Sequence, residues 1–185
     1  MTVLTDAQRA RRPKWQRALI ELRPVTLQIA NQAVADWHRH HIPVRGHCFS
    51  IGAFVAGILA GVAIVGRPVA PGLQDGVTYE LTRLATPEQA CPNVATRLIG
   101  ASWRAARAMG VRRMVSYTRK DELGTCYKAA GWRHVADVKG RPWTTGNKSS
   151  RWLPGLYEPT SDIVDRIRWE IVARGHDDVD CGGEP

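Results

Sequence analysis

The stretch Tyr127–Trp132, Tyr-Lys-Ala-Ala-Gly-Trp, lies where a predicted strand gives way to a short predicted helix. β-Branched and aromatic residues within 112–117 predict the strand, and residues 122–130 predict two helical turns. Gly131 is expected to end the helix in the left-handed conformation, and residues 132–138 predict the next strand. A tyrosine on an amphipathic helix before a glycine cap also occurs in many α/β cores. The motif alone therefore leaves a structural and a catalytic interpretation open.

The segments around this stretch alternate between strand and helix patterns. Period-two and period-3.6 spacing of apolar residues, together with proline and glycine stops, sets the expected boundaries. In chain order, these are a strand at 18–23, a helix at 27–37, a hairpin at 47–55 and 58–65, a strand at 77–86, a helix at 93–109 and a final helix at 161–173. The last helix is expected to begin at an N-cap formed by Ser161 or Thr160.

Residues 51–66 carry no charge and contain Gly57-x-x-x-Gly61, a pattern also found in membrane helices. The run is shorter than the ~20 residues that a membrane span requires. Its glycines and β-branched residues instead suit two strands joined at Ala56-Gly57. We therefore expect a buried hairpin and no association with a membrane.

The charge of the chain is strongly uneven. The formal net charge is +9, and residues 176–185 contain four acidic residues and no lysine or arginine, so removing that tail leaves +13 on residues 1–175. We expect a basic flexible arm at 1–17, one folded domain at 18–175 and an acidic flexible tail at 176–185. A body this basic should attract polyanions such as phosphate, coenzyme A or nucleic acid, although a soluble arginine-rich protein with no such partner has the same composition.

The cysteines and the N-terminus indicate a reduced, cytoplasmic setting. The four cysteines lie far apart and form no Cys-x-x-Cys pair, so neither a disulfide framework nor a zinc knuckle is predicted. Residues 1–17 are polar and basic, without the apolar core of a signal peptide.

Residues 18–138 resemble the GNAT N-acetyltransferase superfamily. Tyr127 and Gly131 match its Tyr-x-x-x-Gly-Phe signature, with Trp132 in place of phenylalanine. The chain is most similar to the divergent phage-type branch that includes the Mom DNA-modification proteins. That similarity rests on Tyr79–Leu84 (Tyr-Glu-Leu-Thr-Arg-Leu), on Asn93 where most members have glycine, and on Glu122-Leu123-Gly124 before the motif. The resemblance implies a mixed central β-sheet flanked by helices in one domain, and an enzyme that modifies an amine on a DNA base.

The resemblance also implies roles for individual residues. Tyr127 would protonate the leaving thiolate, and Glu80 would act as general base, directly or through water. Arg83 would hold a phosphate or an acidic substrate group, and His41 would be a base or contact the substrate, as would His47. Ion pairing with Arg83 or Arg67 is the alternative for Glu80, and an exposed ion pair is the alternative for Arg83.

The implied cofactor is acetyl-CoA or another acyl-CoA. Backbone N–H groups near Leu84, Ala85 and Thr86 would stabilise the thioester oxyanion. The turn at Asn93, Val94, Ala95 and Thr96 would hold the pyrophosphate at a helix N-terminus. This turn departs from the family pattern, because Ala90 replaces a glutamine or arginine and Asn93 replaces the first glycine.

Other residues have weaker signals. Lys148, Arg151 and Trp152 alternate cations with an aromatic ring, as nucleic-acid grooves do, and packing of the tryptophan is the alternative. The histidines between 38 and 47 match no strong ligand motif, so no metal site is predicted.

Three functions are compatible with these features. The first is a DNA-directed acyltransferase, and the second is an N-acetyltransferase for a small-molecule or protein amine. The third is a binding module whose coenzyme A site has degenerated, since Ala90 and Asn93 break the family pattern. The sequence leaves the oligomeric state open.

Overall fold

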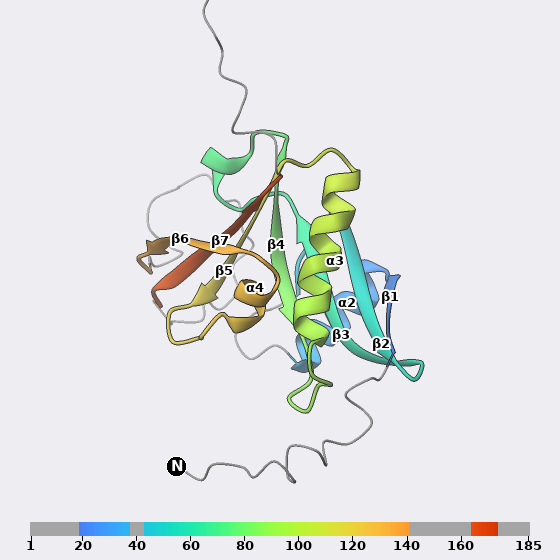
Figure 1. Cartoon of the computed structure of the whole chain (residues 1–185). Coiled ribbons are helices and arrows are strands. Elements are labelled where there is room, and N and C mark those ends of the chain that lie inside the picture. The colour runs from blue at the N-terminus through green and yellow to red at the C-terminus, as the bar shows by residue number, and fades with distance from the viewer. Residues whose placement is uncertain (1–18, 38–42, 141–163, 174–185) are drawn as a thin grey trace, which may run out of the picture.

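The computed structural model describes residues 19–37, 43–140 and 164–173 (Figure 1). Within these ranges the chain forms a seven-stranded mixed sheet in the order β1-β2-β3-β4-β5-β7-β6. The strands are β1 (Ile20–Pro24), β2 (Phe49–Val55), β3 (Ile58–Gly66), β4 (Thr78–Ala85), β5 (Arg113–Arg119), β6 (Arg133–Val138) and β7 (Arg166–Val172). The helices are α2 (Leu27–Trp37), the 3-10 turn η2 (Pro71–Leu73), α3 (Val94–Ala108) and α4 (Thr125–Ala129).

The sheet consists of two antiparallel parts joined by one parallel pair. Strands β1 to β4 pair antiparallel, as do β5 with β7 and β7 with β6, whereas β4 and β5 run parallel. Helix α2 packs on one face, and α3 and α4 lie on the other (Figure 1). The parallel pair therefore lies at the centre, where the two parts of the sheet meet.

Helices α3 and α2 each bury one apolar stripe. Leu98 and Ile99 of α3 are fully buried against the sheet, in a cluster that continues to Met114 and Trp169. Ala30, Ala33 and Val34 of α2 pack with Val62 and Ile64 on the opposite face. The spacing of these residues is the helical spacing from which both helices were predicted.

The expected order up to β6 is confirmed, with small shifts at the ends. The hairpin turns at Ala56-Gly57, where both residues have positive φ (51° and 79°), as a two-residue hairpin loop of the primed type requires. Gly131 has φ 82°, as predicted for a helix stop. Helix α4 is shorter than expected and begins at Thr125, because Gly124 before it is left-handed (φ 58°).

The prediction of a final helix at 161–173 is wrong. Residues 166–172 form strand β7, which inserts between β5 and β6. Ile167, Trp169 and Ile171 alternate with charged residues, which is the period of a half-buried strand. Trp169 is 1% exposed, so the strand places its aromatic residue in the core. Ser161 and Thr160 lie outside the described residues.

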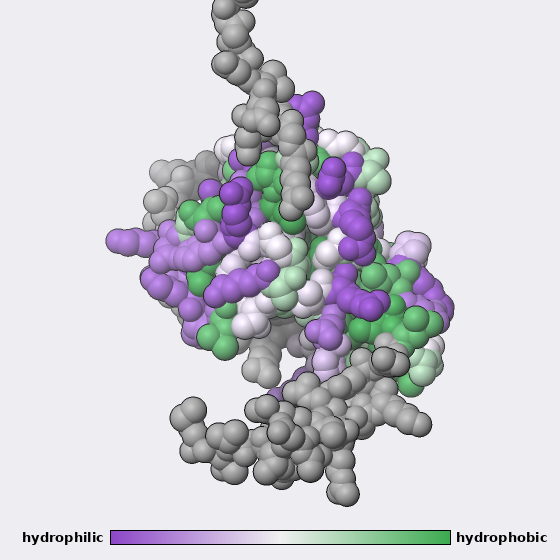
Figure 2. Space-filling model, in the orientation of Figure 1, coloured by the Kyte–Doolittle hydropathy of each residue, from purple (hydrophilic) through white to green (hydrophobic). Residues whose placement is uncertain are grey.

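The apolar run at 51–66 lies inside the sheet, as expected. Val62 to Val65 are fully buried in β3. No helix in the described ranges is long and apolar enough to cross a membrane. At the hairpin end of β1–β3, where Leu19 and Ile58 are exposed, Figure 2 shows a small hydrophobic patch amid mainly polar surroundings. The proposed arm at 1–17 and tail at 176–185 lie outside the described residues and stay predictions.

Candidate active site

Strands β4 and β5 separate shortly after they begin to pair. Their parallel register covers three residues of each strand and ends at Glu80 opposite Val115. Strand β4 continues to Ala85 and β5 continues to Arg119. Because strand backbone groups point alternately to the two neighbours, part of the N–H and C=O groups of β4 after Glu80 face this gap. The gap is the centre of the candidate site.

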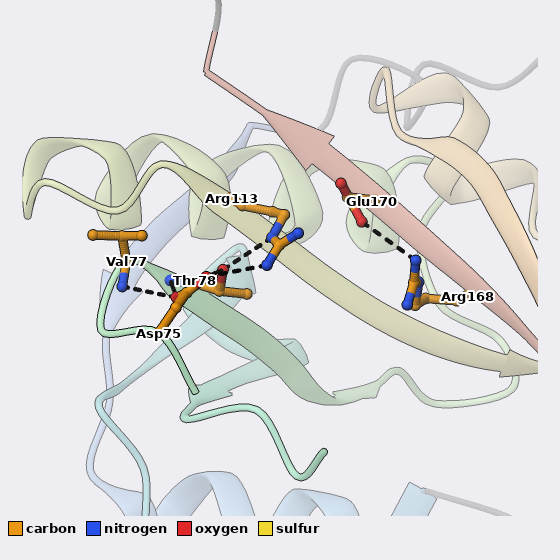
Figure 3. A network of polar contacts seen from close by, with 6 residues as sticks. All are labelled: Asp75, Val77, Thr78, Arg113, Arg168 and Glu170. Carbon is orange, nitrogen blue, oxygen red and sulfur yellow. Dashed lines mark hydrogen bonds and ion pairs between the residues drawn. The ribbon is translucent and has the colours of Figure 1, made fainter. Parts of the chain in front are cut away.

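A polar network fixes the paired end of the two strands (Figure 3). Arg113 donates from Nε to Thr78 Oγ1 (2.9 Å) and from Nη2 to Asp75 Oδ2 (3.1 Å). Asp75 also accepts hydrogen bonds from the backbone N–H groups of Val77 and Thr78. These contacts join the loop before β4 to β5, so the strands diverge from a fixed point.

Tyr127 lies on the α3–α4 side of the gap and is 4% exposed. Its hydroxyl lies 2.8 Å from Ser116 Oγ, which in turn donates to the carbonyl oxygen of Leu81 (2.9 Å). A serine hydroxyl has one proton, so Tyr127 is the donor in the first contact. Burial raises the pKa of Tyr127, an effect that the hydrogen bond with Ser116 opposes. The phenol therefore keeps its proton at neutral pH.

Two tryptophans hold the ring of Tyr127 in place. Trp169 stacks on it with centroids 5.6 Å apart and an interplanar angle of 13°, and Trp132 meets it edge-on at 5.5 Å. Gly124 makes this packing possible, because a Cβ atom there would lie 2.1 Å from Trp169 Cζ2. The short helix α4 can therefore approach β7 closely enough to bring Tyr127 to the gap.

Glu80 reaches the gap from the opposite face, where α2 packs. Its neighbour Leu81 points into the α3 core, so alternation directs Glu80 to the other side. The carboxylate is 6% exposed and accepts a hydrogen bond from the backbone N–H of Val69 (2.8 Å). Burial raises the pKa of Glu80; the Val69 bond and the charges of Arg83 and Arg166 oppose that rise. A carboxylate with a raised pKa is a stronger base than an exposed one.

A bulge in β4 brings Arg83 to the same face as Glu80. The register pairs Leu81 with Val65 and Arg83 with Ile64, and so leaves Thr82 as an extra residue. Without the bulge, residues three apart in a strand would point to opposite faces. Arg83 donates from Nη1 to the carbonyl oxygen of Thr82 (2.7 Å) and lowers the pKa of Glu80. The alternative of an ion pair between Glu80 and Arg83 thus has an electrostatic basis, and the catalytic roles of both residues stay predictions.

The predicted cofactor turn has the expected backbone. Asn93 is left-handed (φ 70°) and precedes α3, whose first turn contains no acidic residue and no side-chain cap. The first N–H groups of such a helix lack intrahelical acceptors and favour an anion. Gly61 lets this end of α3 approach the sheet, because a Cβ atom there would lie 2.7 Å from Val94 Cγ1.

The other predicted cofactor residues surround this turn. Val94 is 1% exposed, so its side chain belongs to the core and only its backbone is available for a ligand. Ala95 and Thr96 in the first turn are partly exposed, as are Leu84 and Thr86 at the end of β4, whereas Ala85 is buried. The residues present therefore fit an anionic cofactor through backbone groups, and their assignment to coenzyme A stays a prediction.

Several predicted site residues lie outside the described residues. These are His41, Lys148, Arg151 and Trp152. His47 is described, and its Nδ1 lies 2.6 Å from Ser50 Oγ. Within the described ranges, no three histidine, cysteine, aspartate or glutamate side chains gather where they could hold a metal ion.

The sequence interpretation missed the two residues that touch Tyr127 from the sheet. Ser116 is a buried polar residue in an apolar strand, which is a local signal, but its partner Tyr127 is 11 positions away. Trp169 was assigned to a helix, although its alternation with Ile167 and Ile171 was the available signal for a strand.

Solved acetyltransferase structures share the fold of this chain. The IAA acetyltransferase from Bacillus cereus superposes with a TM-score of 0.59 at 14% identity, over 84% of this chain and 100% of that chain. The ribosomal-protein-alanine N-acetyltransferase from Brucella melitensis gives 0.57 at 14% identity, over 83% and 99%. An acetyltransferase from Bacillus subtilis in complex with CoA gives 0.53 at 14%, over 84% and 99%. The fold is therefore that of the GNAT acetyltransferases, as predicted.

The sequence also identifies the family. Residues 19–150 match the Mom protein family, and because this match spans most of the chain, the protein belongs to that family. The predicted resemblance to a divergent GNAT branch is thereby confirmed. No curated protein matches the sequence.

Proposed function

We propose that this protein is an acyltransferase that uses an acyl-CoA donor, such as acetyl-CoA, and modifies an amine of a DNA base. The observation that carries the proposal is the placement of a proton donor and a proton acceptor on opposite sides of one gap. The hydroxyl of Tyr127 is hydrogen-bonded to Ser116, and Ser116 donates to the carbonyl oxygen of Leu81 on β4. Glu80 is the residue directly before Leu81. The negative charge of Glu80 also contributes to the raised pKa of Tyr127.

The two groups suit the two proton transfers of acyl transfer. The acceptor amine attacks the thioester carbonyl, the C–N bond forms, and the C–S bond breaks. Glu80 takes the proton that the nitrogen loses, directly or through water, and Tyr127 gives a proton to the departing sulfur. Backbone N–H groups of β4 beyond the bulge hold the oxyanion.

DNA as the acceptor is supported by family and by charge. The resemblance to the Mom DNA-modification proteins implies a DNA acceptor, and residues 1–175 carry a net charge of +13 once the four acidic residues of the tail are set aside. A basic surface binds the phosphate backbone through release of counterions, so the affinity for DNA should fall steeply as salt rises.

Mass analysis of nucleosides from cells that make the protein tests this proposal. We expect a nucleoside of increased mass in cells with the wild-type protein, and its loss with Tyr127→Phe at equal protein level. The Arg104→Ala variant, which removes an exposed cation from the middle of α3, is the matched control and should keep the modification. Unmodified DNA in the wild-type cells would contradict the proposal.

A second candidate function is suggested by a structural neighbour that is named as a ribosomal-protein-alanine N-acetyltransferase. In this candidate the acceptor is a protein or small-molecule amine. Acetyl-CoA turnover on a panel of amines and peptides without DNA separates the two functions. Calorimetric titration with coenzyme A distinguishes these two enzymes from a binding module whose coenzyme A site has degenerated. Such a module would show no heat of coenzyme A binding.

A further inference from the structure

The face of the sheet that carries Glu80 changes character between α2 and β7. Helix α2 covers this face over β2, β3 and β4 with an apolar contact. On β5 and β7 the same face carries Tyr117, Arg166 and Arg168. We refer to these three residues as the arginine face.

The strand register establishes that these residues share a face with Glu80. Glu80 pairs with Val115 in the parallel register, and on β5 Tyr117 lies two residues further on the same side. Tyr117 pairs with Arg168 across the antiparallel register of β5 and β7, and Arg166 lies two residues before Arg168 on β7. Their sequence neighbours Ser116 and Trp169 contact Tyr127 on the other face, which confirms the alternation.

Electrostatic contacts link the arginine face to the candidate base. The charge of Arg166 acts on the carboxylate of Glu80, and the charge of Glu80 acts on the phenol of Tyr117. The charge of Arg168 also acts on the phenol of Tyr117. The arginine face therefore adjoins the gap rather than a distant part of the sheet.

The guanidinium of Arg168 retains donor capacity. Its Nη2 lies 3.9 Å from Glu170 Oε2, which is too long for a hydrogen bond. Figure 3 shows this ion pair on β7. Its Nε is buried and has no hydrogen-bond partner among the described residues. An unpartnered buried donor is costly, and the Arg168 side chain is 31% exposed, so the exposed part of this side chain is where a ligand can accept.

The charge of this surface determines the class of ligand. Arg83, Arg166 and Arg168 are three permanent cations, whereas Glu80 has a raised pKa and Glu170 is the second acid on this face. Arginine forks match the oxygens of a phosphate, and charge-assisted bonds of this kind are about twice as strong as neutral ones. A half-buried tyrosine beside them offers a ring for contact with a sugar or base.

We propose that Arg166, Arg168 and Tyr117 form a phosphodiester subsite that holds the acceptor DNA strand beside Glu80. The acceptor then approaches from the arginine face, and the acyl donor lies on the α3–α4 side. This inference rests on the proposed function, since it assigns the acceptor of that reaction to a surface.

The subsite is tested by the binding of a fluorescently labelled DNA duplex of mixed sequence. The binding is measured by anisotropy over a series of salt concentrations. Arg166→Ala removes an exposed side chain, and the slope of log K against log salt should become less steep by about 0.9, the value for one phosphate contact. Affinity at low salt should fall roughly tenfold, which corresponds to one charge-assisted bond. Arg104→Ala on α3 is the control of equal charge and should leave the slope at the wild-type value.

A second variant separates charge from geometry. Arg168→Lys keeps the cation and loses the guanidinium fork, so the salt slope should stay the same while affinity falls severalfold. The affinity for coenzyme A, measured by calorimetry, should not change in either variant. Equal slopes and affinities for Arg166→Ala and Arg104→Ala would overturn the subsite and leave the proposed function intact. Absence of DNA binding by the wild-type protein, even at low salt, would overturn both.

Discussion

The two sides of the β4–β5 gap hold their polar groups in different ways. On the α3–α4 side, the ring of Tyr127 packs against Trp132 and Trp169, and its hydroxyl forms a hydrogen bond with Ser116. On the other side, Glu80 is buried, and the charges of the half-buried Arg83 and the exposed Arg166 act on it. The first side is positioned by packing and the second by charge. Mutations should therefore act mainly through shape on the first side and through pH and salt on the second.

The largest effect is expected from removal of the Tyr127 hydroxyl. Tyr127→Phe keeps the aromatic packing and should lower the rate of acyl transfer by about 10²–10⁴-fold, the range for loss of a general acid. Ser116→Ala breaks the same hydrogen bond but keeps the phenol, so its rate should stay within about tenfold of the wild type. Single-turnover kinetics on purified protein measures both. Equal losses in the two variants would show that the hydrogen bond, rather than the phenol, matters.

The packing of the enclosed side is tested by two glycines. Gly124 and Gly131 both have positive φ (58° and 82°), but only at Gly124 would a Cβ atom meet Trp169. Gly124→Ala should therefore lower the free energy of unfolding by about 3 kcal/mol or more, the sum of overpacking and backbone strain. Gly131→Ala should cost only the strain, about 1–2 kcal/mol. Urea denaturation of both variants measures these losses in the free energy of unfolding. Equal losses in the two variants would contradict the close approach of α4 to β7.

On the charged side of the gap, the protonation of Glu80 should make the stability of the protein depend on pH. Burial raises the pKa of Glu80 in the folded state, so the folded state binds this proton more tightly than the unfolded state does. The stabilisation is complete below the unfolded pKa and is lost as pH rises through the folded pKa. Glu80→Gln should accordingly raise Tm relative to the wild type at pH 8, with a smaller difference at pH 4. A uniform Tm change across this range would indicate no titration of Glu80 in the window.

The smallest effect, a change in Tm, is expected from mutation of Asp75, at the end of the gap where β4 and β5 pair. Burial acts to raise the pKa of Asp75, but hydrogen bonds from Thr78 and Val77 and the charge of Arg113 outweigh it and lower the pKa. Stability from this group is present above its unfolded pKa and is lost as pH falls through the folded pKa. Asp75→Asn should lower Tm slightly at pH 7, and the difference should disappear in strong acid. The side chain is partly exposed, so the cost should stay near or below about 1 kcal/mol.

The sequence predicted most of the fold because local patterns decide most of it. The apolar stripes of α2 and α3, the turn at Ala56-Gly57 and the stop at Gly131 are each encoded within a few residues. Strand β7 could not be placed in this way, because its position between β5 and β6 depends on pairing with Ser116 and His134, which are far away in the chain.

The candidate site was predicted in part, for the same reason. Tyr127 and Glu80 were found from motifs, whereas their arrival at one gap from opposite faces depends on long-range pairing. Arg83 illustrates the limit most clearly. Simple alternation places it opposite Glu80, and only the bulge at Thr82 brings the two to one face. A bulge depends on the register with β3, which a single strand sequence does not encode.

The pH dependence of acyl transfer tests most directly the claim that Glu80 and Tyr127 act on one reaction from opposite sides. The measurement is the single-turnover rate with acyl-CoA and DNA, for the wild type and for Glu80→Gln. A base must be unprotonated, so the wild-type rate should rise with pH through a group whose pKa is raised from the ordinary value of a glutamate, and then level off. Glu80→Gln should be slow and independent of pH in that window. A variant that retains both the wild-type rate and its rise with pH would contradict the account.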